Sequence, residues 1–249
     1  MRNKEVPKRS MKLSLVIPCY NEAETLAAIV GEVLKIRSET LELELIVVDD
    51  CSQDNSAEVA AELARKHPEV RVARHDANRG KGAALRTGFQ LATGDFVGVQ
   101  DADLEYDPRD YLKMLRVADD FRADVVYGSR YLRDTERQVL RFWHSTMNRF
   151  LTFWSNFFSD LELTDMETCY KLFRREVLAE IAPRLREDRF GFEPEVTALV
   201  AKTLRRQGGR LAECAIRYRP RTFSEGKKIG YRDGLRALWC IVKYNLLVR

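Results

Sequence analysis

The sequence has few of the residues that build disulfide frameworks, histidine metal sites or membrane-spanning helices. Its five cysteines are odd in number and show no Cys-x-x-Cys spacing, which argues against a disulfide framework or a zinc site and favours a reducing cytosol. Its three histidines are too few and too scattered to build a metal site. The longest segment without a charged residue, 150–159, has ten residues, whereas a spanning helix needs roughly 20 apolar residues. With no visible signal peptide, we expect a cytoplasmic protein that does not span a membrane.

Positive charge is concentrated at the two ends of the chain, although the formal net charge is only +4. Residues 1–12 carry five Lys or Arg and one Glu, and residues 202–249 carry thirteen Lys or Arg and three Asp or Glu. Basic ends around an acidic centre indicate an anionic partner, which could be a membrane surface, a phosphate group or nucleic acid. No motif supports the last of these, so we expect no nucleic acid partner.

Apolar runs and helical patterns alternate at short spacing through residue 130. The pattern predicts strands at 13–18, 43–48, 70–73, 96–99 and 124–127. Helices are predicted between them, and Asn21 with Glu24 has the pattern of a capping box for the first helix. This alternation is typical of βαβ units and predicts an α/β fold with a doubly wound parallel sheet. Beyond residue 130 the patterns predict an aromatic helix at 142–158, a helix at 195–206, a strand at 211–218 and an amphipathic helix at 231–247.

Two carboxylates, Asp101 and Asp103, follow the predicted strand 96–99, and Glu105 comes two residues later. In open α/β sheets, ligands bind just beyond the carboxyl ends of the strands. Residues i and i+2 of an extended segment point the same way, so both carboxylates can approach one hard cation. Mg²⁺ or Mn²⁺ held in this way keeps open positions for phosphate oxygens. Because Asp-x-Asp is also common in solvated loops, the interpretation depends on a nucleotide site elsewhere in the chain.

Two other segments fit a nucleotide site. Asp49 and Asp50 end the predicted strand 43–48, where a carboxylate can accept hydrogen bonds from a nucleobase or from ribose hydroxyls. The residues that follow are equally good turn formers. Residues 78–82 form a Gly-rich loop that opens a helix, and its amide groups, with Arg79 and Lys81, favour a diphosphate. An ordinary strand-to-helix turn is the alternative for this loop.

The order of these motifs resembles that of the family-2 glycosyltransferases. The resemblance rests on four segments, which are Val16-Ile17-Pro18-Cys19-Tyr20-Asn21-Glu22, Val47-Val48-Asp49-Asp50-Cys51-Ser52, Asn78-Arg79-Gly80-Lys81-Gly82 and Asp101-Ala102-Asp103-Leu104. It is closer to the polyprenyl-phosphate sugar transferases, such as dolichyl-phosphate glucose and mannose synthases, and covers roughly residues 13–180. It implies a GT-A fold, Rossmann-like and mostly parallel, with a basic tail at 1–12, a catalytic domain at 13–218, and a basic loop and amphipathic C-terminal helix at 219–249.

The resemblance also implies roles for individual residues. The nucleotide-binding residues would be Pro18, Tyr20, Glu22, Asp49, Asp50, Lys81, Asp101, Ala102 and Asp103. The metal, Mg²⁺ or Mn²⁺, would be held by Asp101 and Asp103, with Glu105 where many relatives carry Gln. Arg130 would grip the acceptor phosphate, which a planar guanidinium suits. The catalytic residues would thus be Asp101, Asp103, Arg130 and Asp165.

The implied reaction transfers a hexose, with inversion, from a donor of the UDP-glucose or GDP-mannose type to a polyprenyl phosphate. The metal neutralises the leaving nucleoside diphosphate. A lipid phosphate is already ionised near neutral pH and needs only positioning, whereas a hydroxyl acceptor needs a base, for which Asp165 and Glu167 are the candidates.

Three other functions stay open from sequence. The same fold could use a soluble or glycan hydroxyl acceptor. A sugar-phosphate nucleotidyltransferase would carry a Gly-rich loop directly after the first strand, where this chain has Pro18-Cys19-Tyr20-Asn21. A non-catalytic nucleotide- or membrane-binding module is disfavoured by the intact Asp101 and Asp103.

The aromatic helix at 142–158 fits either a protein core or a membrane interface. Its spacing favours the core for Met147 and Leu151, while its Phe and Trp residues, flanked by Arg141 and Arg149, are typical of an interfacial helix. The basic C-terminal helix could lie against an anionic leaflet. We expect peripheral contact with the cytoplasmic face of a membrane; because the aromatic helix could equally be buried in a dimer, the oligomeric state stays open.

Overall fold

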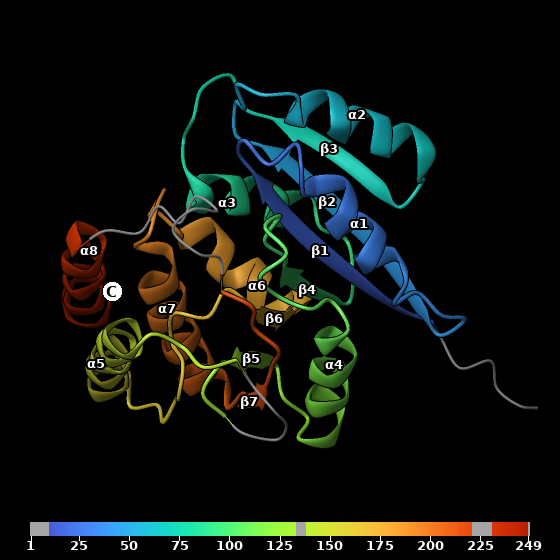
Figure 1. Cartoon of the computed structure of the whole chain (residues 1–249). Coiled ribbons are helices and arrows are strands. Elements are labelled where there is room, and N and C mark those ends of the chain that lie inside the picture. Colours follow the sequence, from blue (N-terminus) through green and yellow to red (C-terminus); the bar gives the residue numbers. More distant parts are fainter. Residues whose placement is uncertain (1–9, 133–137, 221–230, 249) are drawn as a thin grey trace, which may run out of the picture.

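A computed structural model describes residues 10–132, 138–220 and 231–248, which build one mixed sheet covered by helices (Figure 1). The strands are β1 (Met11–Cys19), β2 (Leu41–Asp49), β3 (Val70–Arg74), β4 (Phe96–Val99), β5 (Val125–Ser129), β6 (Lys171–Arg174) and β7 (Leu211–Ala215). The helices are α1 (Leu26–Leu34), α2 (Ser56–Lys66), α3 (Lys81–Leu91), α4 (Asp110–Asp120), α5 (Phe142–Ser159), α6 (Arg175–Ile181), α7 (Phe192–Gln207) and α8 (Tyr231–Val242), with a 3₁₀ turn at Ala182–Arg184 and a π turn at Lys243–Leu247.

The seven strands lie in the order β3-β2-β1-β4-β6-β5-β7. The pairs β3-β2, β2-β1 and β1-β4 are parallel and come from the apolar runs of the first half of the chain. β4 is buried throughout, and β2 at every position except Glu42. Parallel strands covered on both faces read as continuous apolar runs, which is why the sequence predicts them well. The expected α/β fold with a mostly parallel sheet is confirmed.

One strand, β6, is absent from the sequence-based prediction. It is antiparallel to β4 on one side and to β5 on the other, and β7 then continues the sheet parallel to β5. β6 begins at Lys171, which is buried and donates hydrogen bonds to the carbonyls of Met166 (3.0 Å) and Thr168. This short strand places residues 165–170 beside the ends of β4 and β5.

Two hydrophobic clusters cover the two faces of the sheet. One is built with residues of α1, α2 and α4, and the other with residues of α3, α5, α6, α7 and α8. Along β1, Leu15 and Ile17 face the first cluster and Val16 the second, as the alternation of a strand requires. α8 lies beside α5 and α7 (Figure 1) and contributes Ala237 and Ile241 to the second cluster, so the C-terminal helix is packed onto the rest of the fold.

Several local predictions are wrong. The capping box fails because α1 begins at Leu26, after Thr25, while Asn21 adopts a left-handed conformation with φ of 56°. The Asn21 side chain instead accepts a hydrogen bond from the amide of Gln53 at 2.8 Å. Helix α7 begins three residues before the predicted start at 195, and β7 ends three residues before the predicted end at 218.

The outer faces of α5 and α8 carry large apolar side chains in contact with solvent. Met147 is 52% exposed, so its assignment to the core is wrong, whereas Leu151 is buried as predicted. We call the following exposed residues the α5–α8 apolar surface: Phe142, Trp143, Met147, Phe150, Phe153, Phe157, Leu235, Trp239, Leu246 and Leu247. Among the described residues, no helix combines the length and the hydropathy that crossing a bilayer requires.

Candidate active site

The carboxyl ends of four strands bring the predicted site residues to one edge of the sheet. Cys19 at the end of β1 is paired with Asp49 at the end of β2, and Val16 of β1 is paired with Val99 at the end of β4. Tyr20, Asp50 and Asp101 follow these ends directly or within two residues, and Arg130 follows the end of β5. The strand topology therefore assembles these side chains, as the sequence predicted.

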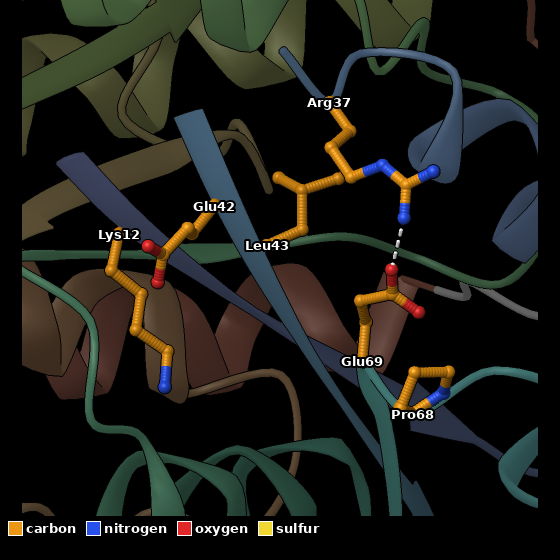
Figure 2. A pocket seen from close by; sticks show the side chains of 6 residues that line it. All are labelled: Lys12, Arg37, Glu42, Leu43, Pro68 and Glu69. Atoms are coloured by element: carbon orange, nitrogen blue, oxygen red, sulfur yellow. Dashed lines mark hydrogen bonds and ion pairs between the residues drawn. The ribbon is translucent and has the colours of Figure 1, made fainter. Parts of the chain in front are cut away.

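A pocket at the opposite edge is a poor candidate for the site. Figure 2 shows that it lies where β1 and β2 begin and that an ion pair between Arg37 and Glu69 closes one side. Its lining residues are Lys12, Arg37, Glu42, Leu43, Pro68 and Glu69. Ligands of open α/β sheets bind at the carboxyl edge instead.

Asp101 is paired with Lys81 from the first turn of α3. The Lys81 ammonium lies 2.7 Å from Oδ1 of Asp101 and donates a hydrogen bond to Sγ of Cys169 at 3.0 Å. A second carboxylate, Glu193 at the start of α7, lies 3.9 Å from the same ammonium. Burial raises the pKa of Asp101, but Lys81 and Cys169 together hold that pKa below its ordinary value. Asp101 is therefore an anion in this site.

The turn that follows Asp101 has an unusual backbone. Leu104 adopts φ of 60°, a region that a bulky side chain rarely enters. Oδ1 of Asp103 accepts the Glu105 amide at 3.1 Å, and Ala102 is buried beneath the turn. The Glu105 carboxylate accepts a hydrogen bond from the Tyr218 hydroxyl at 2.9 Å, which ties the turn to the segment after β7. Backbone strain at a functional turn is a common sign of a ligand-binding loop.

The donor set at this turn fits a divalent cation that is completed by phosphate oxygens. No group of three or more His, Cys, Asp or Glu side chains suited to a metal exists within residues 10–132, 138–220 and 231–248. Mg²⁺ is commonly bound by one or two carboxylates together with substrate phosphates, so Asp101 and Asp103 suffice. In this structure Asp101 is paired with Lys81, Oδ1 of Asp103 accepts the Glu105 amide, and Glu105, the third predicted ligand, accepts a hydrogen bond from Tyr218, so ligation of a metal by these residues stays a prediction.

Asp50 supports the Gly-rich loop. Its carboxylate accepts hydrogen bonds from the amides of Arg79 (2.9 Å) and Gly80 (2.7 Å) and contacts Nδ1 of His75 at 2.6 Å. Asp49 is fully buried, accepts the Ser52 amide and lies 3.1 Å from Nε of Arg74. Through these contacts the Asp pair anchors two loops at the carboxyl edge of the sheet.

The glycines of the loop are required by a neighbouring segment of the protein. The carbonyl of Asp188 accepts a hydrogen bond from the amide of Gly82 at 2.8 Å. A Cβ atom at Gly80 would lie 2.4 Å from that carbonyl oxygen, and one at Gly82 would lie 2.2 Å from the carbonyl oxygen of Glu187. The first amides of α3, predicted to favour a diphosphate, are thus bonded within the protein.

Pro18, Tyr20 and Glu22 lie at the end of β1 beside the Asp pair. Pro18 is paired with Val48 of β2, and Tyr20 is half-buried. The amide of Glu22 donates to the Ser56 hydroxyl at 2.8 Å, and its carboxylate accepts from Thr25 at 2.7 Å. The structure therefore groups these residues with Asp49 and Asp50.

The comparisons with known proteins bear on this arrangement. The family model described as Glycosyl transferase family 2 matches residues 14–182, which is more than half of the chain. The chain belongs to glycosyl transferase family 2. The family-2 chain is 30% identical over 234 residues to the dolichyl-phosphate β-glucosyltransferase of Drosophila melanogaster, covering 88% of this chain and 70% of that protein. It is 37% identical over 123 residues to the dolichol-phosphate mannosyltransferase of Pyrococcus furiosus, covering 49% of this chain and 34% of that protein.

The family-2 chain is shorter than these relatives. It spans about a third of the Pyrococcus protein and 64% of the dolichyl-phosphate β-glucosyltransferase of Dictyostelium discoideum, to which it is 26% identical over 79% of its own length. Among solved structures, mannosyl-3-phosphoglycerate synthase from Rubrobacter xylanophilus has a TM-score of 0.71 at 19% identity, covering 94% of this chain and 73% of that one. Glucosyl-3-phosphoglycerate synthase from Mycobacterium tuberculosis, in complex with Mn²⁺, UDP and glucosyl-3-phosphoglycerate, has a TM-score of 0.68 at 18% identity, covering 94% and 80%. The expected GT-A fold is confirmed.

Directly after β5, Arg130 is held by Asp165. Nε and Nη2 of Arg130 donate to the two carboxylate oxygens of Asp165 at 2.7 and 2.8 Å, and the Arg130 amide adds a third bond at 3.1 Å. Asn148 of α5 donates to the same carboxylate at 3.0 Å, and the guanidinium lies 5.2 Å from the Tyr218 ring centroid. Asp165 is thus a positioning group for Arg130, with its oxygens already engaged.

Glu167 is the second base candidate and has a different environment. Burial, reinforced by the charge of Glu193, raises its pKa to about 8, against the pull of Lys171 and Arg130. Its Oε1 is buried and has no hydrogen-bond partner within the described part of the chain. Near neutral pH this carboxyl is mostly protonated.

The sequence analysis gives no site role to Cys169, Lys171, Glu193 or Tyr218, although Cys169 and Lys171 lie in a segment, 165–173, through which the family resemblance continues. Glu193 was detectable in principle, because Glu193-Pro194-Glu195 has the acidic residues and the proline of a helix start. Nothing in the sequence signals that β6 inverts and brings Cys169 onto Lys81.

Proposed function

We propose that this chain transfers a hexose from a nucleotide sugar, of the UDP-glucose or GDP-mannose type, to a polyprenyl phosphate with inversion at the anomeric carbon. The proposal is supported by the named activities of the dolichyl-phosphate relatives and by one feature of helix α5. The inner face of α5 contributes Asn148 to the Arg130–Asp165 cluster, while its outer face belongs to the α5–α8 apolar surface. An acceptor with a phosphate head and a lipid tail needs a cationic group and an apolar surface close to each other, and α5 contacts the one and carries part of the other.

In this proposal the residues divide into a donor side and an acceptor side. Pro18, Tyr20, Glu22, Asp49 and Asp50 line the nucleoside pocket, and Lys81 lies near the diphosphate. Asp101 and Asp103 hold Mg²⁺ or Mn²⁺, with Ala102 between them and Glu105 beside them. When bound, the cation supplies charge neutralisation for the leaving diphosphate.

On the acceptor side, Arg130 binds the lipid phosphate, and Asp165 fixes the plane of its guanidinium. A phosphate oxygen attacks the anomeric carbon as the bond from that carbon to the diphosphate oxygen breaks. The phosphate is ionised beforehand, so no residue has to remove a proton. Catalysis by this chain is then positioning and electrostatic stabilisation.

We also propose that the α5–α8 apolar surface contacts an anionic membrane on its cytoplasmic face. Arg141 and Arg149 are exposed on α5 beside the aromatic side chains, the arrangement expected of an interfacial helix. Replacing Phe153 and Phe157 by Ser should weaken binding to vesicles containing phosphatidylserine by about tenfold or more, because burying a Phe side chain is worth about 1.5–3 kcal/mol. Phe121→Ser, at an exposed site after α4, is the matched control. Unchanged vesicle binding together with a dimer-to-monomer shift would assign the surface to self-association.

The reaction is tested by release of nucleoside diphosphate from UDP-glucose and from GDP-mannose. Each donor is assayed with Mn²⁺ or Mg²⁺, with and without a short polyprenyl phosphate. Lipid-dependent release that Asp103→Ala abolishes and Asp119→Ala, on the exposed face of α4, preserves would support the proposal and identify the donor. No release from any donor would contradict it.

A hydroxyl acceptor is the alternative, and Glu167 is the observation that favours it. Asp165 is saturated by hydrogen bonds, so a base would have to be Glu167, whose pKa of about 8 suits proton removal at mildly alkaline pH. Release that is indifferent to lipid and lost in Glu167→Gln would support this alternative.

A further inference from the structure

Helix α8 is bonded to a carboxylate that lies between it and the active site. Glu187, in the loop before α7, is buried, and Oε1 accepts hydrogen bonds from Tyr244 at 2.8 Å and from Lys243 at 3.1 Å. Oε2 accepts from Nη2 of Arg236 at 2.7 Å. Burial raises the pKa of Glu187, but these three donors outweigh it and lower that pKa to about 2. The Glu187 side chain is therefore an anion that is fully committed to α8 and the turn after it.

The backbone carbonyls of Glu187 and of the next residue, Asp188, accept hydrogen bonds from α3. The carbonyl of Glu187 accepts a hydrogen bond from Arg86 at 2.8 Å, and the carbonyl of Asp188 accepts the amides of Gly82 at 2.8 Å and Ala83 at 3.4 Å. The Asp188 carboxylate is also paired with Arg86. Because a Cβ atom at Gly82 would clash with the Glu187 carbonyl, the loop and the first turn of α3 are in direct contact.

A third set of contacts keeps this loop from moving independently. The Glu195 carboxylate accepts the amides of Arg186 and Glu187, each at 2.7 Å. A Cβ atom at Gly191 would lie 2.7 Å from both Sγ of Cys240 and Oε2 of Glu187, so the loop also fits closely against α8. Residues 186 and 187 are thus bonded to Glu195, and the loop fits closely against α8.

We propose that Glu187 is a positioning residue that couples the docking of α8 to the first turn of α3, and through Lys81 to Asp101. Lys81 lies in that first turn, and its ammonium is 2.7 Å from Asp101. The coupling runs through the Glu187 side chain, the carbonyls of residues 187 and 188, and the amides of Gly82 and Ala83. Because α8 contributes to the α5–α8 apolar surface, this coupling also links the membrane contact proposed above to the position of Lys81.

The test is amide hydrogen exchange measured residue by residue on the full chain. Arg236→Ala removes one donor from Glu187 at an exposed position. We expect exchange of the Gly82 and Ala83 amides to rise by about tenfold, since a hydrogen bond to a charged group is worth that much in an equilibrium constant. Glu187→Gln should produce at least as large a rise, because its amide nitrogen cannot accept the bonds that one carboxylate oxygen now accepts. Arg236→Lys should restore most of the protection. Glu180→Ala is the matched control, because Glu180 is bonded to Thr203, Arg206 and Gln207 of α7 and to no residue of α3 that the structure describes.

A rise in exchange confined to α8, with Gly82 and Ala83 unchanged, would overturn the proposal. A second readout rests on the proposed function. In Arg236→Ala the KM for the nucleotide sugar should rise about tenfold with kcat nearly unchanged, whereas a merely structural defect would lower the amount of active enzyme and leave KM unaltered. If the wild-type chain transfers no sugar while the exchange result holds, the proposed function fails and the coupling stands.

Discussion

Two carboxylates of the candidate active site, Asp101 and Asp165, are each paired with a cation, but the two pairs differ in kind. The Asp101 side chain is 13% exposed and meets one ammonium from Lys81, itself 27% exposed. The Asp165 side chain is fully buried and receives two guanidinium bonds, one backbone amide and one Asn148 amide. The Lys81 ammonium, at the end of a flexible side chain, can be replaced at Asp101 by another cation. The bidentate Arg130–Asp165 pair cannot separate without destabilising the protein. The proposed donor side therefore contains an exchangeable ion pair and the proposed acceptor side a rigid one.

The largest expected effect comes from breaking the rigid pair. Asp165→Ala leaves the Arg130 guanidinium, only 8% exposed, without its partner, so we expect a loss of about 3–5 kcal/mol in the free energy of unfolding. Chemical denaturation measures this loss. Glu62→Ala is the control, because Glu62 is 53% exposed and paired with Lys66 on the surface of α2, so its loss should cost less than about 1 kcal/mol.

A double substitution separates the unpaired charge from the lost contacts. Asp165→Leu with Arg130→Met removes both charges at once, and most of the stability should return. If Asp165→Ala destabilised the protein no more than Lys81→Met does, the distinction between the two pairs would be wrong.

At the exchangeable pair, Lys81 with Asp101, we expect a smaller effect, which is a gain in metal affinity and not a loss of stability. The Lys81 ammonium occupies Oδ1 of Asp101, where a divalent cation would bind, so Lys81→Met should raise the affinity for Mn²⁺ without nucleotide by about tenfold. Calorimetric titration of the nucleotide-free protein measures it. Lys35→Met, which removes an ammonium paired with Glu32 on the surface of α1, should leave Mn²⁺ binding unchanged. Weaker Mn²⁺ binding in Lys81→Met would mean that Lys81 supports the metal site.

The same contrast explains which parts of the site the sequence predicts. The donor side follows from local rules, because four parallel strands read as apolar runs and topology brings their carboxyl ends together. The positions of Asp50, Asp101 and Lys81 at one edge of the sheet therefore follow from the sequence alone. Their partners could not, because the Asp50 contact with His75 and the Lys81 contact with Cys169 join residues far apart in the chain.

The acceptor side depends on tertiary contacts that override local preference. β6 is only four residues long and starts with a buried lysine, which no pattern of alternation predicts. Its ammonium is satisfied by carbonyls of the preceding loop, a solution visible only in three dimensions. On α5 the aromatic spacing predicts a helix but leaves its rotation undetermined, so Leu151 was placed correctly and Met147 wrongly. The Cys51 position shows a similar limit, since its φ of 61° is invisible in the sequence.

The last expected effect concerns Glu167, whose carboxyl interacts with Arg130 and Asp165 of one pair and with Glu193, which lies 3.9 Å from Lys81 of the other. Its pKa is raised from 4.5 to about 8 in the folded chain, so the folded state holds a proton that the unfolded state has lost between these values. Stability from this group is present below pH 4.5 and declines as pH rises towards 8. In Glu167→Gln that decline should be smaller by at least about 1.4 kcal/mol, the free energy of a one-unit pKa difference. Unfolding free energies at pH 5 and pH 8 measure it, and equal slopes for the wild type and the variant would show that Glu193 and burial do not hold this carboxyl protonated.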